Sequence, residues 1–306
     1  MKRVSTAIVL IFSALVVSST SYSQDDISIP NGPYLGQTPP GAIPEIFAPG
    51  IVNKEGSTDL EGMFGSDMNT FYFVREAEEY AGVVKVGEFK GDEESYGLAV
   101  IEYKNNQWQQ SVVAKAASEP SISPDGNTIL FKTGYIERTS DGWSEMKSLG
   151  EPFASISIMR SAIASSGTIY FDTYTKELDT PLRYSRLVDG KYETPKSLGP
   201  QFGIGRYNAH PYIAPDESYI VFDSVRDAGL GSSDLYISFR EADGWGPAIN
   251  LGDKINTQAS EKNPSVSPDG KFIFFDRRIK RGNSDVTIYW VDAQIIETLR
   301  PKLQTI

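Results

Sequence analysis

The feature that most constrains the fold is an internal repeat of a short hairpin pattern. Each copy has an extended run, a turn, and a second extended run that ends in phenylalanine. The turn positions lie 41 to 58 residues apart and are Asp67, Asp125, Ser166, Asp216 and Asp269. The clearest copies read Pro-Asp-Gly, in which proline presets φ, aspartate bonds back to the chain and glycine accepts a positive φ. Each copy therefore predicts a β-hairpin.

A second element recurs between the hairpins, in which a turn precedes an aromatic residue and a short strand that ends in leucine. Its clearer copies begin at Asp141, Asp189 and Asp243, and a looser copy begins at Asn105. A further strand precedes each of these turns. The repeating unit is therefore four strands within one turn spacing, which is the size of one blade of a β-propeller.

These repeats predict an all-β chain that folds as a single β-propeller of five four-stranded blades over residues 45–292. The last repeat ends after its third strand, and residues 45–52 resemble the fourth strand at 245–251. We therefore expect an N-terminal strand to close the last blade, which removes exposed sheet edges. A six-bladed ring is the alternative, although residues 24–44 are few and proline-rich. We expect 24–44 to be an extended lead-in and 293–306 to form a short helix and tail.

Two segments carry a resemblance to a known family. Residues 264–275 read Pro-Ser-Val-Ser-Pro-Asp-Gly-Lys-Phe-Ile-Phe-Phe, and residues 222–226 read Phe-Asp-Ser-Val-Arg, followed by Ser-Asp-Leu-Tyr at 233–236. These segments resemble the repeat of TolB-like, or WD40-like, propellers of exported bacterial proteins. Such propellers are chiefly partners of other envelope proteins, so the resemblance implies a binding or scaffold role.

The N-terminus has the pattern of a secretory signal peptide over residues 1–23. Lys2 and Arg3 precede an apolar run at residues 7–17, and Ser21 and Ser23 supply small residues for cleavage before Gln24. A membrane anchor is the alternative, but the run is short for a membrane span. We therefore expect an exported, soluble, periplasmic or extracellular monomer whose mature chain has no membrane span.

Charge and composition exclude several classes of function. The formal net charge is −11, which would repel phosphate groups, so we expect no nucleic-acid partner. The chain has no cysteine, which excludes disulfides and thiolate metal sites. Its one histidine cannot supply a histidine-rich metal site, so we expect neither a metal nor another cofactor.

One position of the repeat is polar or charged in all five copies. It lies six residues before each turn position and is occupied by Glu61, Glu119, Arg160, His210 and Asn263. Equivalent positions of a propeller face one another across the axial channel, and strand alternation puts Asn208 and Glu261 on the same face. We predict a ligand-binding circlet of these seven residues at the channel mouth opposite the Pro-Asp-Gly turns. The structural alternative is that these groups fill a wet channel and pair with one another.

Two functions remain open at this stage. The first is a binding or scaffold module for an envelope protein or a glycan. The second is a glycan-active enzyme, either a glycoside hydrolase or a polysaccharide lyase, in which Glu61 and Glu119 form an acid/base pair. No phosphate-binding loop, serine nucleophile elbow or His-Glu zinc motif is present in the sequence, so we favour the binding role.

Overall fold

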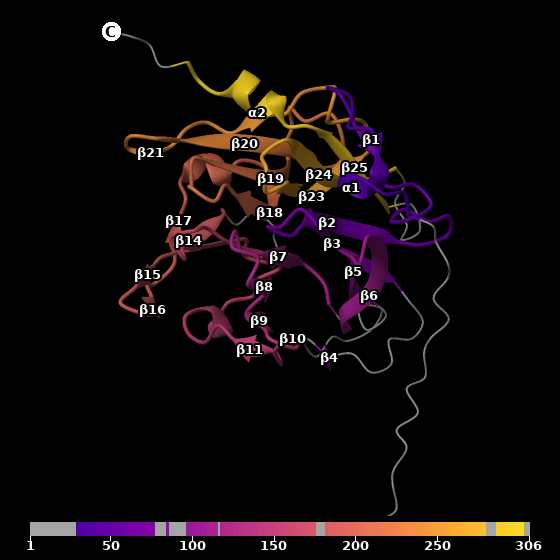
Figure 1. The fold of residues 1–306 in the computed structure, drawn as a ribbon. Coiled ribbons are helices and arrows are strands. Elements are labelled where there is room, and N and C mark those ends of the chain that lie inside the picture. Colours follow the sequence, from indigo (N-terminus) through magenta and orange to yellow (C-terminus); the bar gives the residue numbers. More distant parts are fainter. Residues whose placement is uncertain are drawn as a thin grey trace, which may run out of the picture.

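The strands of the chain are arranged in a ring of small, mainly antiparallel sheets (Figure 1). The computed structural model describes residues 29–76, 84–85, 96–115, 117–175, 181–279 and 286–302. Five sheets radiate from one axis, so the chain is a five-bladed β-propeller, as the repeats predict. The expected signal peptide lies outside the described residues. Within them, none of the helices has the length and apolar character that crossing a membrane would need.

Each blade begins with a strand at the axis and continues outward in chain order, apart from one short edge strand in each of blades 1 and 5. Blade 1 contains β2 (Asp59–Phe64), β3 (Thr70–Glu76), β5 (Tyr96–Lys104) and β6 (Gln107–Lys115), with β4 (Val84–Lys85) beside β6. Blade 2 contains β7 (Pro120–Ile122), β8 (Thr128–Phe131), β9 (Gly134–Thr139), β10 (Gly142–Trp143) and β11 (Lys147–Ser148). Blade 3 contains β12 (Ser161–Ile163), β13 (Ile169–Phe171), β14 (Arg183–Ser185) and β17 (Lys196–Ser197).

The first three strands of blades 4 and 5 are longer than those of blades 2 and 3. Blade 4 contains β18 (Arg206–Ile213), β19 (Tyr219–Val225), β20 (Asp234–Glu241), β21 (Gly244–Trp245) and β22 (Ile249–Asn250). Blade 5 contains β23 (Ser260–Val266), β24 (Phe272–Arg278), β25 (Val286–Asp292) and β1 (Glu45–Ile46). A separate hairpin of β15 (Leu187–Val188) and β16 (Lys191–Tyr192) extends from blade 3, and short 3-10 turns lie at Phe153–Ser155 and Pro200–Phe202.

The ring closes through the N-terminal strand, as predicted. In β1, Glu45 pairs with Trp290 and Ile46 pairs with Tyr289 of β25. The strand is only two residues long, and the side chain of Asn53 extends its pairing. Asn53 Nδ2 donates to the Ile288 carbonyl at 3.1 Å, and Asn53 Oδ1 accepts from the Ile288 N–H at 2.9 Å. First and last segments of the chain are thereby joined in one blade.

The ring has two faces. The turn face carries the turns between first and second strands, including those at Asp125 and Asp269. The link face carries the ends of the second strands, the starts of the third strands and the entry of the chain into each blade. The paired register of Arg206 with Val225 places the start of β18 and the end of β19 together on this link face.

Hydrophobic side chains fill the spaces between neighbouring blades. The junction of blades 5 and 1 is densest in aromatic rings, and its fully buried rings include Phe47, Phe71, Phe274 and Trp290. The junction of blades 2 and 3 is smaller and contains Phe153, Ile158, Ile169 and Phe171. Because each cluster joins two blades, burial of apolar area stabilises the ring as a unit.

The lead-in departs from the extended conformation expected for it. Residues Pro33–Gly36 form the short element α1, in which Tyr34 and Leu35 have φ values of 54° and 57°. This turn inserts Leu35, which is 0% exposed, into the junction of blades 5 and 1. The gain from burying an apolar side chain explains why the segment does not simply run over the surface. At the other end of the chain, α2 (Gln294–Leu299) follows β25 and buries Ile296.

Candidate functional site

Five residues at the same position of the repeat come together around the axis, and we name them the inner ring. They are Glu61, Glu119, Arg160, His210 and Asn263. Four of them have left-handed backbones, with φ values of 59° for Glu61, 57° for Glu119, 48° for His210 and 53° for Asn263. In blades 1, 4 and 5 the pairing of first and second strands shifts register at this point. A bulge of this kind frees a backbone N–H from the ladder, and that N–H needs another acceptor.

Carboxylates on the second strands of blades 3, 4 and 5 accept these N–H groups from the next blade. The bonds run from His210 N to Asp172 Oδ2 at 3.0 Å, from Asn263 N to Asp223 Oδ1 at 3.4 Å, and from Glu61 N to Asp276 Oδ1 at 2.9 Å. All three aspartates are at most 3% exposed. The same chemical device therefore ties blade 3 to blade 4, blade 4 to blade 5, and blade 5 to blade 1.

Blade 1 lacks the aspartate and uses an inner-ring residue in its place. Val74 occupies the position in β3 that aspartate holds in blades 3, 4 and 5. The side chain of Glu61 fills the role, because its Oε2 accepts the N–H of Glu119 in blade 2 at 2.8 Å. Glu61 is 2% exposed, so this carboxyl is an interior structural group.

His210 lies between two carboxylates. Its Nδ1 is 2.6 Å from Asp223 Oδ1, and its Nε2 is 3.5 Å from Glu119 Oε1. Burial disfavours the charged imidazole, but the carboxylates of Asp223 and Glu119 outweigh burial and raise the pKa of His210 to about 10. The side chain is therefore an imidazolium at neutral pH.

The carboxyl groups around the inner ring divide into two kinds. Burial, followed by the charge of Glu119, raises the pKa of Glu61 well above its usual value. Burial also raises the pKa of Asp276 to about 7 and that of Asp172 to about 6. Burial opposes ionisation of Glu119 as well, but His210 and Arg160 prevail and lower the pKa of Glu119. Glu119 is thus the ionised partner of the imidazolium.

Arg160 differs from the other inner-ring residues because its guanidinium is not engaged. Its backbone N–H donates to Asp172 Oδ1 at 3.0 Å, and the whole residue is only 3% exposed. Nε and Nη1 are buried without a hydrogen-bond partner among the residues that the structure describes. Its charge nevertheless acts on Glu61, Glu119 and Asp276 of three other blades, so the guanidinium lies near the axis.

The two further predicted site residues, Glu261 and Asn208, have structural partners. Glu261 Oε1 accepts from Arg277 Nε at 2.8 Å, and Arg277 also donates to the Ile255 carbonyl at 2.7 Å. Asn208 Oδ1 accepts from Ser224 Oγ at 3.0 Å. Both residues are at most 4% exposed. These contacts hold the entry of the chain into blades 4 and 5.

The structure therefore brings the predicted residues together but buries them, whereas the sequence suggested an open channel mouth. On the link face, cavities of about 10 and 40 Å³ reach the ring beside Asn208 and Asn263. Tyr207 covers this side, and its ring centroid lies 6.2 Å from that of His210. Lys262 Nζ lies over the Tyr207 ring, 4.1 Å from its centroid. The inner-ring residues are buried because hydrogen bonds between neighbouring blades hold their polar groups in the interior.

Sequence analysis missed the aspartates that make these bonds. Asp172, Asp223 and Asp276 each follow the phenylalanine that ends the second run of a repeat. This Phe-Asp pair in three of the five repeats was a signal that could have identified them. In the described part of the chain, no group of three or more such acidic or histidine side chains could hold a metal ion.

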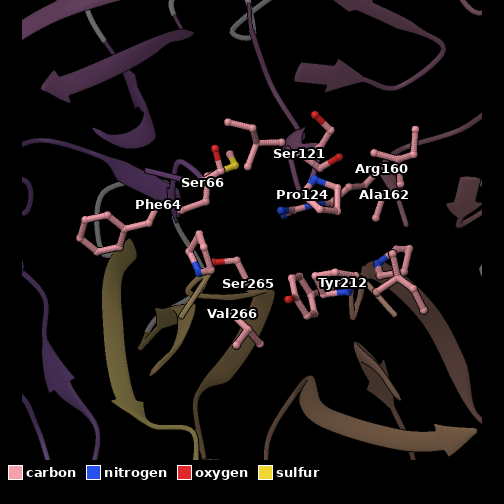
Figure 2. A pocket seen from close by; sticks show the side chains of 17 residues that line it. Phe64, Ser66, Ser121, Pro124, Arg160, Ala162, Tyr212, Ser265 and Val266 are labelled. Atoms are coloured by element: carbon pink, nitrogen blue, oxygen red, sulfur yellow. The ribbon is translucent and has the colours of Figure 1, made fainter. Parts of the chain in front are cut away.

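Two larger openings flank the inner ring. On the turn face, an axial cavity of about 100 Å³ has Arg160 among its lining residues (Figure 2). On the link face, a groove of about 370 Å³ lies between blades 4 and 5 and is lined by Tyr207, Val225, Lys262, Arg278 and Ile279, among others. We name these the axial cavity and the link-face groove. They are the places where another molecule could contact the propeller.

Comparison with known proteins does not assign this chain to a family. No protein-family model matches the sequence, and neither does any curated protein. Among solved structures, TolB from Acinetobacter baumannii is 14% identical over 77% of this chain and 57% of that chain, with a TM-score of 0.44. This chain therefore spans little more than half the length of that TolB.

Two solved enzymes have similar chain paths. An α-L-arabinofuranosidase from Podospora anserina is 11% identical over 82% of this chain and 93% of that chain, with a TM-score of 0.45. An arabinanase from Bacillus subtilis is 11% identical over 82% of this chain and 96% of that chain, with a TM-score of 0.42. Function has to be inferred from the residues of this chain.

Proposed function

We propose that this propeller is an exported binding module that recognises a segment of a protein partner through its link face. The link-face groove is the observation that carries the proposal. It combines apolar walls with cationic side chains in a chain whose net charge is −11. The N-terminal pattern of residues 1–23 supports a periplasmic or extracellular location.

Exposed apolar side chains gather on the link face. Tyr174 is 54% exposed, Ile204 55%, Leu230 42% and Ile279 64%. Each follows the second strand of its blade or precedes the first strand, so all four lie at the link-face end of blades 3, 4 and 5. Exposed apolar side chains on the same face as the groove favour a protein-binding role for that face.

The charges of the groove point to the kind of partner. Lys262 Nζ lies over the Tyr207 ring, and neither Lys262 nor Arg278 forms an ion pair with any residue that the structure describes. Cationic heads beside apolar walls suit a segment that combines acidic and apolar residues.

The enzymatic alternative is less well supported by the contacts of its two carboxyl groups. A glycosidase needs an acid and a base or nucleophile that both reach the substrate. Glu61 is 2% exposed and its Oε2 accepts the Glu119 N–H, while Glu119 faces His210. We therefore assign both residues to the structure of the ring.

The experiment expresses the full chain and recovers the mature protein, expected to be residues 24–306, from the periplasm, which also tests export. Partners are captured by cross-linking from envelope extracts, purified, and titrated against the immobilised propeller. The double variant Ile279→Asp with Lys262→Glu is expected to weaken binding by about tenfold or more. Its matched control is Leu187→Asp with Lys191→Glu, which makes the same charge change on the exposed β15–β16 hairpin.

The outcomes separate the alternatives. Saturable binding that the link-face variant weakens and the hairpin control retains supports the proposal. Equal loss in both double variants, or absence of any saturable partner, contradicts it. Turnover of a polysaccharide that Glu119→Gln abolishes would replace it with the enzymatic function.

A further inference from the structure

The axial cavity is built by side chains from all five blades. Met63, Ile122, Ile163, Tyr212 and Val266 contribute one wall residue from each blade in turn. Figure 2 shows labelled side chains of different blades surrounding the cavity, with Arg160 and Ala162 on one side and Phe64 on the other. Prolines of the turns, including Pro124 and Pro268, line its outer part. The cavity therefore has mainly apolar walls and opens toward the turn face, away from the link-face groove.

The serine hydroxyls of the lining donate elsewhere. Ser121 Oγ donates to the Ser161 carbonyl at 2.5 Å, and Ser265 Oγ donates to the Gly62 carbonyl at 2.7 Å. Ser66 and Ser123 both donate to Asp125. These bonds join neighbouring blades or brace a turn. They leave the Arg160 guanidinium as the charged donor available to a molecule in the cavity.

The buried guanidinium of Arg160 favours a negatively charged ligand. Nε and Nη1 of this guanidinium are buried without a hydrogen-bond partner among the described residues, so no hydrogen bond there replaces their lost hydration. Its planar fork matches a carboxylate, which accepts two parallel N–H bonds. The acidic groups nearby have other partners: Glu61 Oε2 accepts the Glu119 N–H at 2.8 Å, and Glu119 Oε1 lies 3.5 Å from His210 Nε2.

We propose that the axial cavity binds a carboxylate carried on a short apolar body, with the carboxylate on Arg160 and the apolar part against Ile122, Ile163 and Val266. A free monocarboxylic acid and the C-terminus of a polypeptide share this chemistry. The site is independent of the link-face proposal, because it lies on the other face and shares no lining residue with the link-face groove.

The test is calorimetric titration with hexanoate and phenylacetate, and with hexanamide as the uncharged match. The acids are expected to bind and the amide to bind at least about tenfold more weakly, because hydrogen bonds between two charged groups are stronger than those to a neutral amide. Arg160→Met should abolish the preference for the acid. Lys196→Met, which removes a cation from outer strand β17, should leave binding unchanged.

A second variant keeps the proposal testable if Arg160→Met fails to fold. Ala162→Leu narrows the cavity and retains the guanidinium, so it should weaken binding of the larger phenylacetate most. A Leu-Phe dipeptide with a free C-terminus, compared with its C-terminal amide, distinguishes a chain end from a free acid. Absence of binding by both acids and by the dipeptide, or equal binding of acid and amide, overturns the proposal.

Discussion

At the scale of single residues, one carboxylate holds several donors and so fixes how two blades meet. Asp276 accepts the Glu61 N–H with both oxygens, at 2.9 and 3.1 Å, and its Oδ2 also accepts from Asn263 Nδ2 at 2.8 Å. Blade 5 and blade 1 are the two ends of the repeat array. A short polar contact therefore supports the junction where the ring closes.

We predict that Asp276→Ala lowers the free energy of unfolding by at least about 2 kcal/mol, because two buried donors lose their acceptor. Asp276→Asn is the matched control: it keeps an acceptor for the Glu61 N–H, and the pKa of about 7 means that a neutral side chain is already tolerated there. It should lose less than half as much. Urea unfolding at pH 7 measures both, and an alanine variant as stable as the parent would contradict the assigned role.

At the scale of elements, the closing strand is short and depends on an asparagine outside it. Asn53 pairs with Ile288 of β25, and Asn256 pairs in the same way with Leu235 of β20, through bonds of 2.8 and 3.0 Å. The two asparagines lie at equivalent places, just before the chain enters blades 1 and 5. Only Asn53 supports the joint between the chain ends.

We predict that Asn53→Ala costs about 1–3 kcal/mol of stability and accelerates hydrogen exchange at the Ile288 amide. Asn256→Ala removes the same bonds inside a continuous blade, so it should lower stability by a similar amount and accelerate exchange at Leu235 instead. Exchange measured by NMR separates the two. Unchanged protection of Ile288 in Asn53→Ala would show that β1 alone holds the closure.

The sequence predicted the strands and blades better than it predicted the contacts between them. The turn residues at Asp125 and Asp269 correctly predicted hairpins, because turn formation depends on local sequence. The number of repeated hairpins predicted the five blades. The convergence of Glu61 and His210 followed from ring symmetry. Their burial did not, because it depends on bulges and on Asp223 and Asp276, whose partners lie in other blades. Local sequence does not specify which backbone N–H a bulge releases, nor which distant carboxylate receives it.

At the scale of the whole molecule, the charges inside the ring and the charges on its surface both lower the free energy of unfolding as pH rises. The sequence pI is about 4.8, so the net negative charge grows above that pH and its self-repulsion grows with it. Inside, the folded state holds protons on His210, Asp276 and Asp172 more tightly than the unfolded chain does. The free energy of unfolding should therefore depend on pH both through surface charge repulsion and through the protons bound inside the ring.

We predict that the free energy of unfolding is greatest near pH 5 and falls toward pH 9. The pKa of Asp172 rises from 3.8 to about 6 and that of Asp276 from 3.8 to about 7, so their contribution is present below pH 4 and is lost as pH rises through these values. The pKa of His210 rises from 6.5 to about 10, so its contribution is complete below 6.5 and disappears toward pH 10. Denaturant midpoints in steps of pH measure the curve. His210→Gln should flatten the part of the curve above pH 6.5 while leaving the decline between pH 5 and 6, and a variant with the parent's slope above pH 6.5 would remove His210 as the cause.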